Sequence, residues 1–126
     1  MKSYQSDSRQ LGNEKESLAA KFLTARGIRL KERNYQCRFG EIDLIACDHE
    51  FLIFVEVRFR SSSAYGTSAE TVDKVKQGKI ILCARHYLLT HSCHNNFNCR
   101  FDVIGINNGA RRGSHNIQWI RDAFQT

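Results

Sequence analysis

The sequence predicts an α/β domain in which helices flank a central mixed β-sheet. Two segments, over about residues 8–26 and 72–89, carry apolar residues at helical spacing. Between and after them lie short segments rich in β-branched and aromatic residues, which are typical of strands. The second helical segment crosses between a predicted hairpin and the last two predicted strands, and we therefore expect one mixed sheet.

Length and composition favour one cytoplasmic domain. A chain of 126 residues suits a single domain, residues 1–126, of which we expect residues 1–8 to be flexible. Hydrophobic residues make up 41% of the chain, and no apolar run is long enough to cross a membrane. The first seven residues lack the apolar core of a signal peptide, so we expect a cytoplasmic protein with no membrane partner.

The cysteines and the net charge indicate the compartment and the kind of partner. The five cysteines form no C-x-x-C pair, and we expect free thiols. The net charge of +6 favours an anionic partner, and nucleic acid is the commonest such partner for a small basic domain.

The first helix is expected over about residues 8–26, with Asp7 or Ser8 as its N-cap and Gly27 as its stop. Its predicted buried stripe consists of Leu11, Leu18, Phe22 and Ala25. Glu14 falls on this stripe. It either satisfies the free backbone amides of the first turn or supplies a carboxylate to a site on the sheet.

An edge strand over about residues 28–37 leads into a β-hairpin with arms at 39–46 and 51–60. A turn centred between Asp48 and His49 places Asp43 and Glu56 on one face as diagonal neighbours.

Buried carboxylates at positions 43 and 56 are costly unless they are paired. Mg²⁺ or Mn²⁺ would offset that cost, because Mg²⁺ needs only a few carboxylate oxygens besides waters and phosphate. The alternative is a structural ion network in which Asp43 and Glu56 pair with Arg38, Arg58 or Arg60.

A small polar loop over residues 61–68 lies beyond the acidic face, where loops often contact substrate. The helix that follows has an apolar stripe of Ile80, Ala84, Tyr87 and Leu88. Extended backward, this stripe reaches Gln77 and Lys76, which places both near the sheet. The alternative for Lys76 is an ordinary solvated lysine. Strands over 100–106 and 116–120 complete the chain, joined by a loop that carries Arg111 and Arg112.

Five motifs together resemble the YraN-like family of bacterial proteins, over about residues 11–124. They are Gly12-Asn13-Glu14, Gly40-Glu41-Ile42-Asp43-Leu44-Ile45, Phe54-Val55-Glu56-Val57-Arg58-Phe59-Arg60, Lys76-Gln77 and Arg100-Phe101-Asp102-Val103. That family is similar in pattern to the restriction-endonuclease-like, or PD-(D/E)XK, nucleases, and especially to archaeal-type Holliday junction resolvases. The resemblance implies a restriction-endonuclease-like fold.

The resemblance also implies roles for five catalytic residues. Glu14 matches the helix glutamate of these nucleases, and Asp43 and Glu56 match the ligands of a bound Mg²⁺ or Mn²⁺. Arg58 stands where the nucleases have a lysine, and an arginine stays protonated and cannot act as a base. Lys76, on the neighbouring helix, is the candidate replacement.

The function that the resemblance implies is metal-dependent hydrolysis of phosphodiester bonds in DNA, including branched or junction DNA. We expect Arg58, Arg60, Lys76 and Gln77 to contact the nucleic acid. The junction-cutting relatives imply a homodimer. Two other interpretations remain open, namely a nucleic-acid-binding module that keeps the fold without turnover and a structural protein with an inert ion network.

Overall fold

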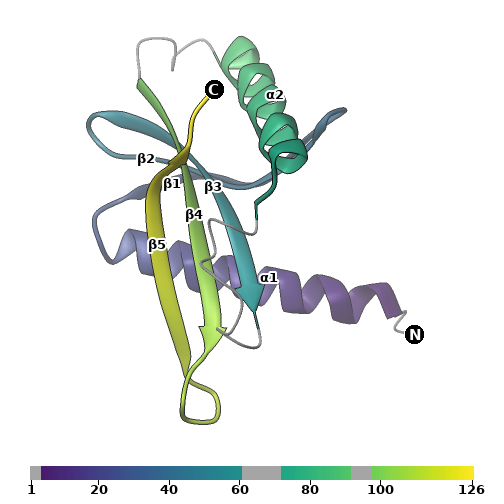
Figure 1. Ribbon diagram of the computed structural model, residues 1–126, viewed down its shortest axis with the longest axis vertical. Helices are drawn as coiled ribbons and strands as arrows, with labels where there is room; N and C mark the ends of the chain where they lie inside the picture. The colour runs from purple at the N-terminus through teal and green to yellow at the C-terminus, as the bar shows by residue number, and fades with distance from the viewer. Residues whose placement is uncertain (1–3, 61–71, 92–97) are drawn as a thin grey trace.

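A computed structural model of the chain describes residues 4–60, 72–91 and 98–126, and the side chains of residues 4–11 and 60 are not described. The elements are α1 (Tyr4–Thr24), β1 (Arg29–Cys37), β2 (Gly40–Cys47), β3 (Phe51–Arg60), α2 (Lys74–Thr90), β4 (Asn98–Asn108) and β5 (His115–Phe124) (Figure 1). The loop that was expected over residues 61–68 to contact substrate lies outside the described residues.

The five strands form one sheet in the order β1-β2-β3-β4-β5. Neighbouring strands are antiparallel except for β3 and β4, which are parallel and are connected through α2. The prediction of an α/β fold with a mixed sheet is therefore confirmed, and so is the edge position of β1. This architecture is consistent with the restriction-endonuclease-like fold.

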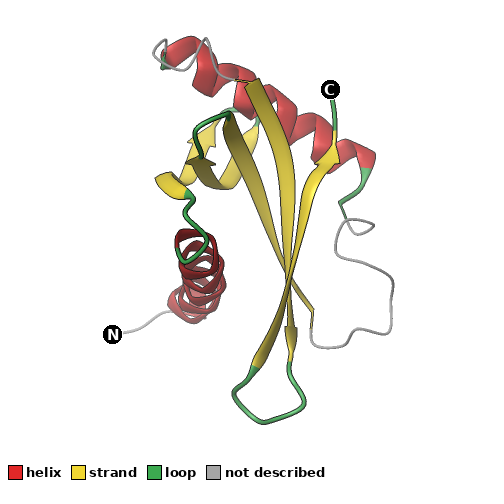
Figure 2. Ribbon diagram, turned by 90° about the vertical axis from the view of Figure 1, so that its left-hand side faces the viewer, coloured by secondary structure: helices red, strands yellow, loops and turns green. Residues whose placement is uncertain are grey.

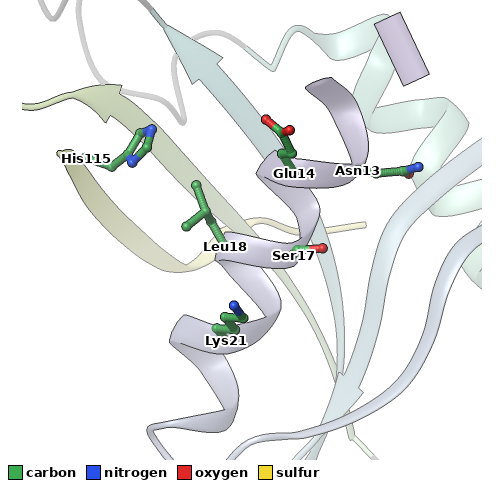
Figure 3. A pocket seen from close by; sticks show the side chains of 6 residues that line it. All are labelled: Asn13, Glu14, Ser17, Leu18, Lys21 and His115. Atoms are coloured by element: carbon green, nitrogen blue, oxygen red, sulfur yellow. The ribbon is translucent and has the colours of Figure 1, made fainter. Parts of the chain in front are cut away.

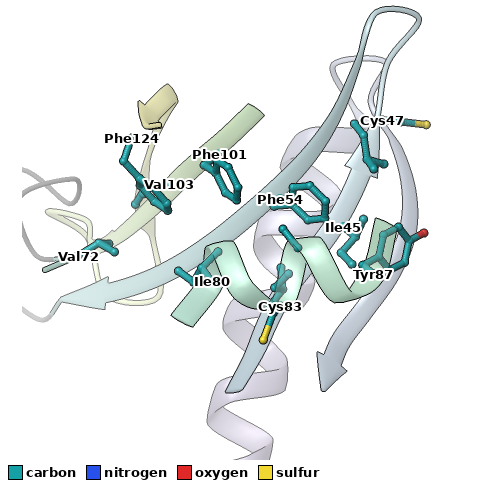
Figure 4. Close-up of a cluster of buried hydrophobic side chains, with 13 residues drawn as sticks. Ile45, Cys47, Phe54, Val72, Ile80, Cys83, Tyr87, Phe101, Val103 and Phe124 are labelled. Atoms are coloured by element: carbon teal, nitrogen blue, oxygen red, sulfur yellow. The ribbon is translucent and has the colours of Figure 1, made fainter. Parts of the chain in front are cut away.

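The two helices cover opposite faces of the sheet (Figure 2). Because side chains alternate along β3, Ile53 and Val55 pack on the α1 side while Leu52 and Phe54 pack on the α2 side. The α2 side holds the larger core, whose members from the helix are Ile80, Cys83, Ala84 and Tyr87 (Figure 4). These confirm the predicted stripe of α2, in which Leu88 is partly buried.

The start of α1 differs from the prediction, whereas its end agrees with it. The helix begins at Tyr4, so Asp7 and Ser8 lie inside it and neither is the N-cap. It ends at Thr24, in the turn before Gly27, whose φ of +84° is the left-handed conformation that favours glycine. The N–H groups of Gly27 and Ile28 donate to carbonyl groups of the last turn, which caps the helix.

The buried stripe of α1 also differs from the prediction. Ala19, Ala20 and Leu23 are buried, whereas Ala25 is exposed. Leu18 and Phe22 of the predicted stripe are partly buried and pack against the same core. Alanines contribute little to a hydrophobic pattern, so larger residues dominated the prediction. Glu16 lies three and four residues before the two alanines and therefore shares their face. Leu11 lies outside the described side chains.

The hairpin register is shifted from the predicted one. Leu44 pairs with Val55 and Ala46 with Ile53, so the turn is centred between His49 and Glu50. The reason is Asp48, whose carboxylate accepts hydrogen bonds from the backbone N–H groups of the two residues that close the turn. Asp43 and Glu56 are consequently the next residues on β2 and β3 beyond the last pair, Leu44 with Val55. They are not the diagonal neighbours that we predicted.

The other predicted elements agree with the structure within a few residues. Asp73 caps α2 by accepting a hydrogen bond of 2.8 Å from the backbone N–H of Lys76. Within the described ranges, neither helix has the length and apolar character needed to cross a membrane. The described cysteines, Cys37, Cys47, Cys83 and Cys99, are free thiols, as predicted, and Cys93 lies outside the described residues.

Candidate functional site

The candidate site begins where the β2–β3 ladder ends. Leu44 and Val55 form the last pair of that ladder. Directly beyond it, Oδ2 of Asp43 accepts a hydrogen bond of 2.8 Å from the backbone N–H of Val57. A side chain thus satisfies a strand amide, and this bond fixes the Asp43 carboxylate against β3.

Glu56 lies beside Asp43 and is almost fully buried, with 4% of its surface exposed. The two carboxyl groups are joined by a side-chain hydrogen bond. Burial, the charge of Asp43 and this hydrogen bond together raise the pKa of Glu56 to about 8. Burial also raises the pKa of Asp43. The predicted convergence of these carboxylates is confirmed, and at neutral pH the metal-free pair retains a proton.

Two cationic side chains approach the same oxygen of Glu56. Nη1 of Arg58 lies 3.5 Å from Oε2, and Nζ of Lys76 lies 3.7 Å from it. Both cations lower the pKa of Glu56, but by less than burial and Asp43 raise it. Lys76 comes from the first turn of α2, so the prediction that it lies near the sheet is confirmed.

The other two residues predicted to bind nucleic acid are placed differently. Gln77 is half-buried, and its side-chain amide donates a hydrogen bond of 2.8 Å to the carbonyl of Val72, just before α2. The side chain of Arg60 lies outside the described residues. Arg111 and Arg112 are exposed in the loop between β4 and β5.

The structure does not bring Glu14 to the carboxylate pair. Glu14 is exposed and lines a separate pocket between α1 and the start of β5 (Figure 3). The residues that line this pocket are Asn13, Glu14, Ser17, Leu18, Lys21 and His115. Glu14 is exposed because it does not lie on the buried stripe that the structure gives for α1.

Glu16 is a carboxylate of α1 that interacts electrostatically with Asp43. Burial raises its pKa, and the charge of Asp43 is the next largest cause. Its Oε1 atom is buried without a hydrogen-bond partner among the described residues. The sequence analysis missed Glu16, although its spacing from Ala19, Ala20 and Leu23 was the signal that could have revealed it.

Two residues of β1 hold this part of α1 against the sheet. Nη2 of Arg33 donates to the backbone carbonyl of Asn13 at 3.3 Å and to Oγ of Ser17 at 3.0 Å. Asn34 has a φ of +53°, a left-handed conformation that asparagine tolerates well. A hydrogen bond from its side chain lowers the pKa of Glu16 and so partly offsets the effect of burial.

The donor set fits a hydrated divalent cation better than a closed cage. Across the described residues, no three or more His, Cys, Asp or Glu side chains form a group arranged to hold a metal ion. Mg²⁺ does not need such a group, because it keeps several waters and binds through one or two carboxylates. Asp43 and Glu56 meet that requirement, since a cation between them would replace the proton that they retain.

Comparison with known proteins gives a family for the sequence. The profile of the Uncharacterised protein family UPF0102 matches residues 15–106, a segment that contains Glu16 and begins after Glu14. A UPF0102 protein of Nitrosococcus oceani is 46% identical over 117 residues, which cover 93% of each chain. One of Alcanivorax borkumensis is 44% identical over 113 residues, or 90% of each chain. One of Nitrosomonas europaea is 46% identical over 113 residues, covering 90% of this chain and 92% of the relative.

Proposed function

We propose that this chain, which belongs to the UPF0102 family as its YraN-like motifs predicted, is a metal-dependent endonuclease that hydrolyses phosphodiester bonds in DNA. The observation that carries the proposal is the Asp43–Glu56 pair, in which the buried carboxyl group of Glu56 and the half-buried one of Asp43 share a hydrogen bond at the end of a ladder. Buried groups with strongly shifted pKa values are typical of catalytic sites. The net charge of +6 supports a polyanionic substrate.

Asp43 and Glu56 would hold Mg²⁺ or Mn²⁺. When bound, the metal would polarise the phosphate and lower the pKa of a coordinated water. Lys76 and Arg58 bind the scissile phosphate and stabilise its developing charge, because both reach Glu56 and remain partly exposed. Glu16 takes the role that the resemblance gave to Glu14, and positions the Asp43 carboxylate through its charge.

The wider interface follows from the same proposal. Arg60 and Gln77 contact the DNA backbone near the site, and Arg111 and Arg112 add exposed charge on the loop between β4 and β5. Branched or junction DNA is the proposed substrate. A cytoplasmic homodimer would present two such sites, one for each of the two DNA strands that are cut at a junction.

A second candidate function is a nucleic-acid-binding module that lacks turnover. The observation that favours it is Arg58, since a guanidinium stays protonated and cannot take a proton from water. Both functions require DNA binding, but only the first requires cleavage. Lys76 is the structural feature that separates the two functions, because it brings an amine from α2 to Glu56, where Arg58 brings only a guanidinium.

The test is a cleavage assay on junction, flap and linear DNA with Mg²⁺, Mn²⁺ or a chelator. We expect wild-type protein to cut at least one substrate with metal, Asp43→Asn to be inactive, and Glu14→Gln to match the wild type. Asparagine can still accept the hydrogen bond from Val57, so the metal-free Tm of Asp43→Asn should not fall. Binding without cleavage by the wild type on every substrate would support the second function and reject the first.

A further inference from the structure

We propose that Cys37 and Cys83 form a reversible disulfide by exchange with a low-molecular-weight disulfide of the glutathione class. Their Sγ atoms lie 2.9 Å apart and are hydrogen-bonded, although the residues are 46 positions apart in the sequence. The proposal rests on this geometry alone and does not depend on nuclease activity.

The two sulfur atoms are already close to bonding distance. A disulfide has an S–S length of about 2.05 Å, so the pair must close by less than about 1 Å. Cys37 is the last residue of β1 and is partly exposed, which gives an incoming disulfide a route to it. Cys83 lies on the inner face of α2 and is fully buried (Figure 4). The other described cysteines differ. Cys47 is buried and Cys99 is exposed, and the sulfur of neither contacts another described sulfur atom.

The surroundings of the pair indicate which sulfur reacts first. The sulfur of Cys37 accepts a hydrogen bond of 3.4 Å from the backbone N–H of Phe39. Burial raises the pKa of Cys83 to about 12, and its hydrogen bond to Cys37 contributes. Cys83 therefore keeps its proton at neutral pH. Because the thiolate is the attacking species, Cys37 is the first nucleophile.

The exchange proceeds in two balanced steps. The Cys37 thiolate attacks one sulfur of the small disulfide, which forms a mixed disulfide and releases one small thiolate. Cys83 then gives up its proton and attacks Sγ of Cys37, which forms the protein disulfide and releases a second small thiolate. In sum, two protein thiols and one small disulfide become one protein disulfide and two small thiols. The high pKa of Cys83 makes the second step slow, and it should accelerate as pH rises.

The disulfide would join the end of β1 to the middle of α2. The β1–β2 turn already approaches this helix, since a Cβ on Gly40 would lie 3.9 Å from Cβ of Lys79. Lys76 lies two turns before Cys83 on the same helix, so the cross-link would restrain the helix that carries it. Closing a loop of 46 residues restricts the unfolded chain, and we expect Tm to rise by roughly 5–15 °C.

The experiment uses the full chain with Cys93→Ser and Cys99→Ser, incubated with oxidised or reduced glutathione and then alkylated. Intact mass and peptide mapping should show a Cys37–Cys83 disulfide after oxidised glutathione, and an unreacted Cys47 as the internal control. In this background Cys83→Ser should stop at a Cys37–glutathione adduct, and Cys37→Ser should leave Cys83 unmodified. The oxidised form should melt higher, and reduction should reverse the shift.

Three outcomes would overturn the proposal. One is full alkylation of both cysteines after prolonged incubation with oxidised glutathione. Another is a Cys37–glutathione adduct that persists after prolonged incubation at raised pH while Cys83 remains free in the same molecule. The third is an equal rate of modification of Cys83 with and without Cys37. Because every readout is a mass or a Tm, failure here is distinct from a failure to cut DNA.

Discussion

The backbone N–H of Val57 donates a 2.8 Å hydrogen bond to the carboxylate of Asp43. If the β2–β3 ladder continued, this amide would pair with the backbone of β2. Without such a partner it would remain open to water. Here the acidic side chain replaces the missing backbone partner, so the residue that completes the hydrogen bonding of β3 is also the one that faces Glu56. The geometry of the candidate site and local folding are therefore coupled at this position.

The first prediction concerns pH. Burial raises the pKa of Glu56 from 4.5 to about 8 on folding, so the folded chain binds more protons than the unfolded chain between these values. Stability contributed by this group is complete below about pH 4.5 and is lost as the pH rises through about 8. We expect the metal-free Tm of the wild type to fall over this range relative to that of Glu56→Gln, which stays neutral. A constant difference between the two Tm curves would contradict the shifted pKa.

The second prediction compares two glutamates of α1. Glu16→Gln removes the charge of a half-buried carboxylate that interacts with Asp43 and should weaken Mg²⁺ binding about tenfold, whereas the exposed Glu14→Gln should leave it unchanged. The metal-free Tm of Glu16→Gln should be unchanged or higher, because burial disfavours its charged form. Isothermal titration calorimetry with Mg²⁺ measures both affinities. Equal weakening by the two variants would rule out the assignment of Glu16.

A third prediction concerns DNA binding and salt. Neutralising phosphates releases counterions, so the logarithm of the binding constant should fall linearly with the logarithm of salt concentration. Lys76→Ala should reduce the slope by about one, because it removes one phosphate contact. Lys31→Ala, which changes an exposed lysine of the edge strand β1, is the matched control. Fluorescence anisotropy over a salt series gives the slopes, and absence of binding at low salt would count against both nucleic-acid functions.

The fourth prediction concerns stability at Asp102, which is fully buried. Its carboxylate accepts hydrogen bonds from Nε and Nη2 of Arg100, from Nε1 of Trp119 and from the backbone N–H of Asp122, all between 2.8 and 3.0 Å. Asp102→Ala should lower the free energy of unfolding by about 3–5 kcal/mol, because it leaves the largely buried guanidinium of Arg100 without its carboxylate partner.

The control for this prediction is Asp122→Asn. Asp122 is exposed and has a φ of +54°, which asparagine also adopts readily, so the change should be within about 0.5 kcal/mol. Urea unfolding of both variants tests the difference. A loss at Asp102 no larger than that at Asp122 would show that the network is not structural.

Much of the fold could be predicted from local patterns. The β-branched and aromatic residues of the hairpin, the stop signal at Gly27 and the inner stripe of α2 each depend on neighbouring residues only, and each agrees with the structure. The hairpin register could not be predicted, because it depends on which amides the Asp48 side chain accepts. The longer β5 was missed because its second half alternates polar and apolar residues weakly.

The candidate site was predictable in part for the same reason. Asp43 and Glu56 share a face in the predicted and in the observed register, because a shift by two residues leaves each side chain on the same face of the sheet. Their convergence was therefore predicted correctly although the register was not. Glu16 was missed because the alanines that define its face carry little hydrophobic signal. The Cys37–Cys83 pair is set by the packing of α2 against β1, and no local pattern reports a contact across 46 residues.

The attachment of α1 has a consequence for how activity would be lost on heating. Its apolar contacts come from Ala19, Ala20 and Leu23 together with the partly buried Leu18 and Phe22, while the first half of the helix is held by exposed polar bonds from Arg33. Such a segment opens at a lower free-energy cost than the sheet. When this segment opens, Glu16 would move away from Asp43 while the core remains folded. Thermal inactivation should therefore precede global melting, and amide hydrogen exchange should be faster in the first half of α1 than in β3.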